Sequence, residues 1–444
     1  MKNKINFHAT FSILTGLTLF FLIFILFTVS ATSAQTSSPA VTETRITTHQ
    51  SAENPVIYGD NIVWQDNRNG NWDIYIYNLS TRKEIHTINK SNQISPDIYG
   101  DKVVWQDNRT GNEDIFFQNL STKKQARITT NESNQYSPAI YEDKIVWVDG
   151  RNGGCLDEYG NSIGSVDIYM FNLSSNKETR ITTSGAATNP DIYGNIIVWQ
   201  DHRDQQYDSY SNIYMFDLST MKETQITTSE LAISPAIYSD KIVWEDARNW
   251  TFGDIYMYNL STSTESQISN SSRAYNPAIY GDRIVYEDNR YDASGNTDLF
   301  MYDLFTNKEI LLTAWDEFQG GPDDEWSDEY QVDAAIYEDR IVWAGGYQGS
   351  YDIYLGTPLS NLPEAAFLAS PISGKVPLKV QFSDKSTGAP TSWKWSFGDK
   401  TYSTQKNPKH TYSKPGKYTV SLTVKNAAGN NTKTVPGYII VKNK

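Results

Sequence analysis

One motif recurs seven times along this chain, and it constrains the fold more than any other feature. The first copy reads PVIYGDNIVWQDNR and begins at Pro55. The others begin at Pro96, Pro138, Pro190, Pro235, Pro277 and Ala334, with a period of 41 to 57 residues. Each unit holds β-branched and aromatic runs of strand length separated by turn residues, without a helical period. The repeat predicts an all-β fold, a seven-bladed β-propeller with four strands per blade.

The seventh unit lacks its fourth strand. Each unit runs through PxIY, IVW and DIY strands to a final ITT strand, but the seventh ends at Tyr354-Leu355-Gly356 with no ITT behind it. Near the start of the chain, Thr44-Arg45-Ile46-Thr47-Thr48 repeats the sequence of residues 179–183. An incomplete last blade would leave an unpaired edge at the seam of the ring. We therefore expect this N-terminal strand to complete the seventh blade.

An aromatic residue ends the second strand of every unit. These residues are Trp64, Trp105, Trp147, Trp199, Trp244, Tyr286 and Trp343. An aromatic ladder offers a stacking surface for sugar rings, but an aromatic residue repeated in register in every unit is typical of a packed core. We expect these side chains to pack between blades.

The first six of these strands are followed by Asp-x-Arg. The pairs are Asp66 and Arg68, Asp107 and Arg109, Asp149 and Arg151, Asp201 and Arg203, Asp246 and Arg248, and Asp288 and Arg290. The seventh unit has Gly345 and Tyr347 instead. Active sites are asymmetric, whereas these pairs recur around the ring. We expect them to staple loops, by bonding to the loop backbone or to the Asp that opens the next strand, such as Asp73.

Loop length varies only in the connections between second and third strands and between fourth and first strands. Insertions occur at 151–166, 202–211, 291–297 and 313–332. In an up-and-down blade both kinds of connection emerge on the same side of the disc. Variable loops on a rigid scaffold are where binding usually resides. We therefore expect this loop face to be the interaction surface.

The insertion at 313–332 is strongly acidic. It contains Asp316, Glu317, Asp323, Asp324, Glu325, Asp328 and Glu329, together with Trp315 and Trp326. Carboxylates at this density suit Ca²⁺, which takes six to eight oxygen ligands. The spacing is not that of an EF-hand, however, and a solvated acidic loop is the favoured interpretation. We predict no catalytic, cofactor-binding or metal-binding residues.

Composition and the N-terminus restrict the functional classes. The formal net charge of −14 disfavours nucleic acid as a partner. Cys155 is the single cysteine, so no intrachain disulfide forms, and the histidines His8, His49, His86, His202 and His410 show no metal-ligand spacing. Residues 1–34 carry Lys2 and Lys4 before an apolar stretch, the layout of a secretory signal or a retained N-terminal anchor. Ten Asn-x-Ser/Thr sequons, including Asn78, fit an exported glycoprotein.

The repeat string PxIYxDxIVWxDxR…DIYxYNLST…ITT, spanning about residues 44–358, resembles the TolB-like propellers. It resembles more closely the short repeats of surface proteins of Methanosarcina-type archaea. The resemblance implies the fold. It does not imply one activity, because such propellers include partner-binding modules, domains attached to peptidases and polysaccharide lyases.

The repeat disappears after a linker at 359–364, and a different pattern begins. Trp393-Lys394-Trp395-Ser396-Phe397-Gly398-Asp399, followed by His410, Tyr412 and the alternating run 418–424, resembles a PKD domain over residues 365–444. That resemblance implies an immunoglobulin-like β-sandwich acting as an extracellular spacer or adhesive module without catalysis. Trp395 and Phe397 share one strand face and are expected in its core.

These observations predict a signal or anchor at 1–34, a linker at 35–43, a propeller at 44–358, a linker at 359–364 and a PKD domain at 365–444. The expected function is a non-enzymatic extracellular or cell-surface scaffold that binds a protein or surface glycan through its loop face. It needs no cofactor, and it meets a membrane only through a retained N-terminal segment. The alternative is a polysaccharide-active, lyase-like enzyme, for which His202 and the acidic loop are the asymmetric candidates.

Overall fold

The structure is a computed structural model. It describes residues 41–87, 89–156, 162–203, 211–248, 253–290, 296–313, 329–347, 349–358, 363, 365–388, 390–426 and 429–443. Within these ranges every regular element is a β-strand. The described residues contain no helix that is long and apolar enough to cross a membrane. The expected signal or anchor at 1–34 and the acidic side chains of 314–329 lie outside the described residues and side chains.

The described part of the chain contains seven four-stranded antiparallel sheets, six of which follow chain order. The first is β2 (Ala52–Tyr58), β3 (Asn61–Asp66), β4 (Asp73–Asn78) and β5 (Lys83–His86). The next two are β6 (Gln93–Tyr99), β7 (Lys102–Asp107), β8 (Asp114–Asn119) and β9 (Lys124–Arg127), then β10 (Gln135–Tyr141), β11 (Lys144–Asp149), β14 (Asp167–Asn172) and β15 (Lys177–Arg180).

Three further sheets repeat the arrangement. They are β16 (Ala187–Tyr193), β17 (Ile196–Asp201), β18 (Asn212–Asp217) and β19 (Lys222–Gln225); β20 (Ala232–Tyr238), β21 (Lys241–Asp246), β22 (Asp254–Asn259) and β23 (Thr264–Gln267); and β24 (Ala274–Tyr280), β25 (Arg283–Asp288), β26 (Asp298–Asp303) and β27 (Lys308–Leu311). A small hairpin, β12 (Cys155–Leu156) and β13 (Ser162–Ile163), lies in the insertion between β11 and β14.

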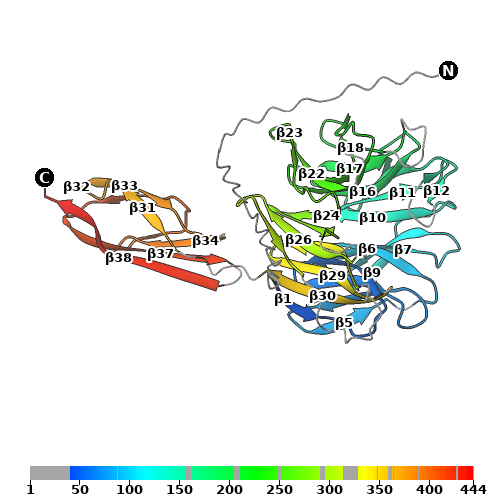
Figure 1. Cartoon of the computed structure of the whole chain (residues 1–444), viewed down its shortest axis with the longest axis horizontal. Coiled ribbons are helices and arrows are strands. Elements are labelled where there is room, and N and C mark those ends of the chain that lie inside the picture. Colours follow the sequence, from blue (N-terminus) through cyan, green and yellow to red (C-terminus); the bar gives the residue numbers. More distant parts are fainter. Residues whose placement is uncertain are drawn as a thin grey trace, which may run out of the picture. The chain divides into compact units, whose positions relative to one another are not determined.

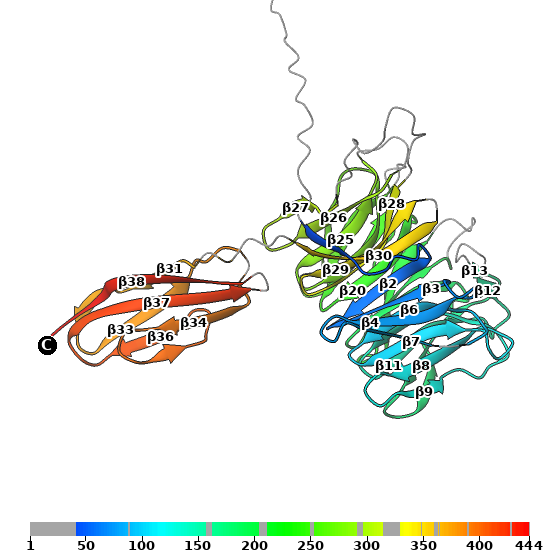
Figure 2. The ribbon, with the colours of Figure 1, turned by 90° about the horizontal axis from the view of Figure 1, so that it is seen from below.

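The seventh sheet joins the two ends of the repeat region. It contains β28 (Glu329–Tyr337), β29 (Arg340–Tyr347), β30 (Ser350–Pro358) and, as its outer strand, β1 (Val41–Arg45). β1 runs antiparallel to β30, with Val41 opposite Pro358 and Arg45 opposite Tyr354. Figures 1 and 2 show the blue β1 beside β30, although more than 300 residues separate them in the chain.

The fourth strand of each sheet differs from the prediction. It is the segment that ends in Arg or its equivalent, so the ITT residues follow the strand instead of forming it. Two residues after β15, Thr182 Oγ1 accepts a hydrogen bond from the N–H of Ile168 (2.9 Å) and donates to Asp167 (2.9 Å). Thr47 makes the same two bonds, to Ile353 N (2.9 Å) and Asp352 (2.7 Å). The threonine therefore caps the third strand, which explains why ITT recurs.

The repeated aromatic residues form the core between sheets, as the sequence predicts. All six tryptophans of this set are at most 1% exposed. Trp64 packs against Val342, Ala344 and Ile353 of the seventh sheet. Because these indole rings are enclosed by the neighbouring sheet, they are unavailable for stacking on sugars.

The Asp-x-Arg pairs are staples, and of the two expected partners they use the loop backbone. Asp66 accepts hydrogen bonds from Arg68 N (2.9 Å), Arg68 Nε (2.8 Å) and Trp64 Nε1 (3.2 Å). The Arg68 guanidinium lies 4.1 Å from the centre of the Tyr75 ring and reaches Glu84 on β5 (3.1 Å). The arginine thus folds back over its own sheet and does not bond Asp73, because the aromatic ring of the third strand offers a cation–π surface.

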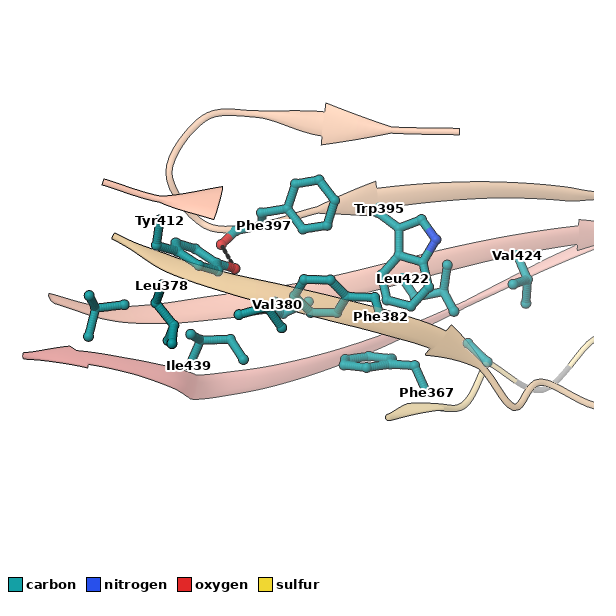
Figure 3. Packing of buried hydrophobic residues seen from close by; sticks show 13 residues of the cluster. Phe367, Leu378, Val380, Phe382, Trp395, Phe397, Tyr412, Leu422, Val424 and Ile439 are labelled. Carbon is teal, nitrogen blue, oxygen red and sulfur yellow. Dashed lines mark hydrogen bonds between the residues drawn. The ribbon is translucent and has the colours of Figure 1, made fainter. Parts of the chain in front are cut away.

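The C-terminal domain consists of two sheets around a separate core. One sheet contains β31 (Phe367–Ser370), β33 (Leu378–Asp384) and β36 (Lys409–Tyr412). The other contains β32 (Ser373–Lys375), β34 (Ser392–Ser396), β35 (Tyr402–Ser403), β37 (Gly416–Asn426) and β38 (Gly429–Lys442). Trp395 and Phe397 are 0% and 2% exposed, which confirms their predicted core position. Figure 3 shows these rings with the Tyr412 hydroxyl, which donates to the carbonyl of Phe397 (2.9 Å).

Asp399 connects the turn after Phe397 to β36. It bonds His410 Nε2 (2.8 Å), and His410 stacks on Phe397 with ring centres 4.3 Å apart. Burial opposes ionisation, but hydrogen bonds from Thr401 and His410 hold the pKa of Asp399 below its usual value.

We expect Asp399→Ala to weaken this domain at pH 7 by about 1–2 kcal/mol, because it leaves His410 without its partner. Hydrogen-exchange protection of residues 397–412 in the full chain measures the effect. Since a lowered folded pKa gives stability that is lost as pH falls through it, the difference between variant and parent should shrink toward pH 3. Lys394→Ala, on the exposed side of β34, is the control. Equal protection in Asp399→Ala and parent at pH 7 would refute the assignment.

Candidate functional site

The first strand of each sheet carries a β-bulge. In β2, register shifts between Glu53 and Val56, so that two residues oppose one on β3. The residue before the proline, or before Ala334 in the seventh strand, has a left-handed backbone, with φ between 47° and 57° in all seven strands. The residues are Asn54, Ser95, Ser137, Asn189, Ser234, Asn276 and Asp333. They are all Asn, Ser or Asp, short polar types that tolerate turns and bulges better than branched residues do.

These bulges surround a cavity of about 390 Å³ that is open to solvent. Bulge residues, the prolines that follow them and a few small apolar side chains line it. Asp333 is the one ionisable side chain among the thirteen described lining residues. The lining residues stand two to four positions before the tyrosine that ends each first strand, so the cavity lies nearer than that tyrosine to the side from which the variable loops emerge.

Side chains of the second strands tie the cavity wall together. The N–H of Ser95 donates to Gln65 Oε1 of the preceding sheet (2.8 Å), and the N–H groups of Ser137 and Ser234 reach Gln106 and Gln200 (3.4 Å each). In the later sheets carboxylates take this role. Asp333 N donates to Glu287 (2.8 Å), and Asn54 N donates to Asp333 (3.4 Å).

The carboxyl groups of this arc have raised pKa values. Burial raises the pKa of Glu245 to about 7, and a backbone hydrogen bond from Asn276 only partly offsets it. Burial and the nearby charge of Asp333 raise the pKa of Glu287 well above its usual value. Glu287 is 1% exposed, and its Oε2 has no hydrogen-bond partner in the described residues. Burial also raises the pKa values of Glu53 and Asp333.

Seven tyrosines form a closed ring at the other ends of the first strands. Neighbouring ring centres are 4.6–4.9 Å apart, and the last tyrosine contacts the first. The residues are Tyr58, Tyr99, Tyr141, Tyr193, Tyr238, Tyr280 and Tyr337. Burial and hydrogen bonding to Tyr58 and Tyr141 raise the pKa of Tyr99, so its hydroxyl stays neutral.

The first strands surround an opening along the axis of the ring, called the channel below, and the tyrosines narrow it. Neighbouring ring planes meet at 47–52°, close to the roughly 51° that relates seven equivalent radial units. The planes therefore run along the axis, and at such spacing the rings face one another and turn their edges inward. Seven centres so spaced lie on a circle about 5.4 Å in radius, and a phenol ring reaches roughly 3.5 Å from its centre. The remaining opening is about as wide as a water molecule.

The other candidate residues named from the sequence lie away from this cavity or outside the described residues. His202 Nε2 lies 3.1 Å from the side-chain nitrogen of Gln200, and Cys155 is a half-buried free thiol in the β12–β13 hairpin. Among the described residues, no three or more His, Cys, Asp or Glu side chains are grouped so that they could hold a metal ion. The acidic loop, interpreted from the sequence as solvated rather than as a Ca²⁺ site, falls outside the described residues and side chains.

Sequence comparison identifies the C-terminal domain. Residues 363–441 match the PKD domain family. Collagenase ColA of Bacillus cereus is 45% identical over 116 residues, 24% of this chain and 12% of that protein. The microbial collagenase of Vibrio alginolyticus is 35% identical over 91 residues, 20% of this chain and 11% of that protein. The chain thus spans about a tenth of the length of these curated relatives.

Solved structures resemble the repeat region in fold. An oligogalacturonate lyase from Vibrio parahaemolyticus is 15% identical and covers 71% of this chain and 93% of its own, with a TM-score of 0.55. An oligogalacturonate lyase in complex with manganese is 14% identical and covers 73% of this chain and 95% of its own, with a TM-score of 0.53. The β-propeller domain of the Trilobed protease from Pyrococcus furiosus is 14% identical and covers 71% of this chain and 97% of its own, with a TM-score of 0.51. The chain is therefore an all-β protein with a propeller fold and a C-terminal PKD domain.

Proposed function

We propose that this chain is a non-enzymatic, exported or cell-surface scaffold that binds a protein or surface glycan through the loop face of its propeller. The observation that carries the proposal is the solvent-open cavity of about 390 Å³, which lies on the side where loop length varies. The PKD domain fits an extracellular adhesive role. Glycosylation and a secretory signal belong to the same proposal.

The proposed scaffold is a seven-bladed ring closed by β1. Two observations support it. β1 supplies the outer strand beside β30, and the tyrosine ring returns from Tyr337 to Tyr58 with centres 4.6 Å apart. Within the TolB-like propellers, we assign the chain to surface proteins of the Methanosarcina type on the strength of the repeat string alone.

The function is tested by filling the cavity. Ala335 lines it, whereas Thr264 is exposed on the outer strand β23. The exported chain is immobilised, and proteins and glycans are captured from surface extracts. We expect Ala335→Phe to abolish capture of the specific partner and Thr264→Phe to leave it intact. Capture that is equal for both variants would contradict a role for this face.

A lyase-like, polysaccharide-active enzyme is the second candidate, favoured by the shared fold of the two oligogalacturonate lyases. Among its described lining residues the cavity has no basic side chain to bind an anionic polymer. The one ionisable side chain there is the carboxyl Asp333, with Glu287 and Glu245 behind it. Incubation with polyuronates, followed by the ultraviolet absorbance of unsaturated products, separates the two candidates. Product formation would replace the scaffold by the enzyme.

A further inference from the structure

Two of the seven first strands carry a carboxylate, Asp97 or Asp191, close to their tyrosine. They occupy the position two residues before the tyrosine, which in the other five strands is Val56, Ala139, Ala236, Ala278 or Ala335. Val56 and Ala335 line the cavity, so this position borders the channel. Asp97 and Asp191 are half-buried although they lie on the innermost strands. Their exposed surface therefore faces the channel.

Neither carboxylate is neutralised by a cation. Asp97 accepts hydrogen bonds from the N–H groups of Ile98 (2.8 Å) and Ile140 (2.7 Å). Asp191 accepts the equivalent bonds from Ile192 (2.7 Å) and Ile237 (2.8 Å). Each oxygen thus accepts one backbone N–H and keeps a free lone pair. In the described residues neither aspartate forms an ion pair. Burial and, to a smaller extent, the charge of Asp191 raise the pKa of Asp97 to about 7.

The tyrosine ring leaves this channel one usable entrance. An opening about as wide as a water molecule admits no side chain or sugar. A ligand therefore enters from the loop face, with one end first. The bulge residues at the cavity wall and the two aspartates are two residues apart along each strand, about 7 Å. An extended lysine side chain reaches roughly 6 Å from Cα to Nζ. A lysine whose Cα lies at the level of the bulge residues therefore reaches the aspartates.

We propose that the channel is a blind well for a lysine side chain of a protein partner docked on the loop face, with Asp97 and Asp191 receiving its ammonium group. The inference rests on the proposed function and narrows it to a protein partner. An ammonium makes strong, charge-assisted hydrogen bonds to carboxylates. It also supplies the positive charge that the wall, with Asp333 at its upper edge, does not contain among its described lining residues.

The test uses the full exported chain and two small probes, Nα-acetyl-lysine N-methylamide and the neutral norleucine analogue, with binding measured by ligand-observed NMR. The lysine probe is expected to bind at least about tenfold more tightly than norleucine. Asp97→Ala/Asp191→Ala should remove that preference. Alanine already occupies the position in four other strands, so the variant keeps a residue that this fold accommodates. Neutralising two exposed carboxylates elsewhere, Glu132→Gln/Glu338→Gln, should leave the preference intact.

Equal binding of both probes, or a preference that survives the double alanine variant, would overturn the lysine well. A simple glycoside that binds in the channel, with no preference for lysine, would overturn it in favour of a glycan. Capture of the surface partner distinguishes this proposal from the loop-face function on which it rests. If the double alanine variant still captures the partner while Ala335→Phe does not, the loop-face function stands and the lysine well falls. If Ala335→Phe captures normally, the loop-face function itself fails.

Discussion

Replacing Glu245 and Glu287 by glutamine is expected to raise the melting temperature at pH 8 by several degrees and to flatten its dependence on pH between 5 and 8. Glu287 is buried and Glu245 half-buried behind the cavity lining, with pKa values raised to about 7 for Glu245 and well above normal for Glu287. A raised folded pKa means that the folded state holds a proton which the unfolded chain releases. The stability it confers is complete below the unfolded value near 4.5 and is lost as pH rises through the folded pKa.

The size of the effect follows from the shift. For Glu245, moving from 4.5 to about 7 corresponds to roughly 3 kcal/mol at pH 8, since one pKa unit is worth about 1.4 kcal/mol. Glutamine is the natural choice because Gln65, Gln106 and Gln200 already make the same link in other sheets. It keeps the acceptor and carries no charge to bury.

Thermal melts at pH 5, 6, 7 and 8 test this expectation, with the exposed Glu132→Gln as control. The control should track the parent at every pH. The interpretation fails if the double glutamine variant loses stability with rising pH as steeply as the parent does. Facing carboxyls, Asp333 and Glu53, also have raised pKa values, so a residual slope smaller than that of the parent is consistent with the assignment.

Deleting residues 35–48 is expected to lower the melting temperature by about 10 °C or more, because a loss of several kcal/mol shifts a domain of this size by that amount. The deletion removes β1 from the edge of β30 and takes away the Arg45 and Thr47 partners of the buried Asp352. Asp352 would then be left with an unpaired charge, which is costly at a buried position. The exposed edge of β30 would also favour aggregation.

The matched control removes only residues 35–40, which precede β1. It should melt like the parent. Asp352→Ala tests the same contacts without shortening the chain and should cause a smaller loss. If the longer deletion melts at the parent temperature, β1 does not stabilise the seventh sheet, and the proposal of a ring closed by the N-terminus is wrong.

Much of the fold was predictable because it is local and repeated. Trp64 and its counterparts are buried between sheets, and Trp395 lies in the core of the PKD domain, as their strand positions indicate. The fourth strand was misplaced by a few residues, because Thr182 caps a strand rather than lying within one. Periodicity alone does not distinguish a strand from the segment that caps it.

The candidate site was less predictable. The tyrosine before each tight turn repeats as regularly as the tryptophan, and repetition alone does not distinguish a side chain at the axis from one packed between sheets. Asp97 and Asp191 carried a usable signal, because they break a position that is otherwise small and apolar. That signal has meaning only once the position is known to border a channel.

The sequence by itself determined the strands, the turns and the number of repeat units, since these depend on residue type and on contacts close in the chain. Only the tertiary structure decided which side chains meet at the axis. The bulge at residues such as Asn54 inserts one residue and reverses the alternation of faces beyond it, so Val56 and Tyr58 point where simple alternation would not place them. The contact between Tyr58 and Tyr337 likewise exists because the last sheet lies beside the first.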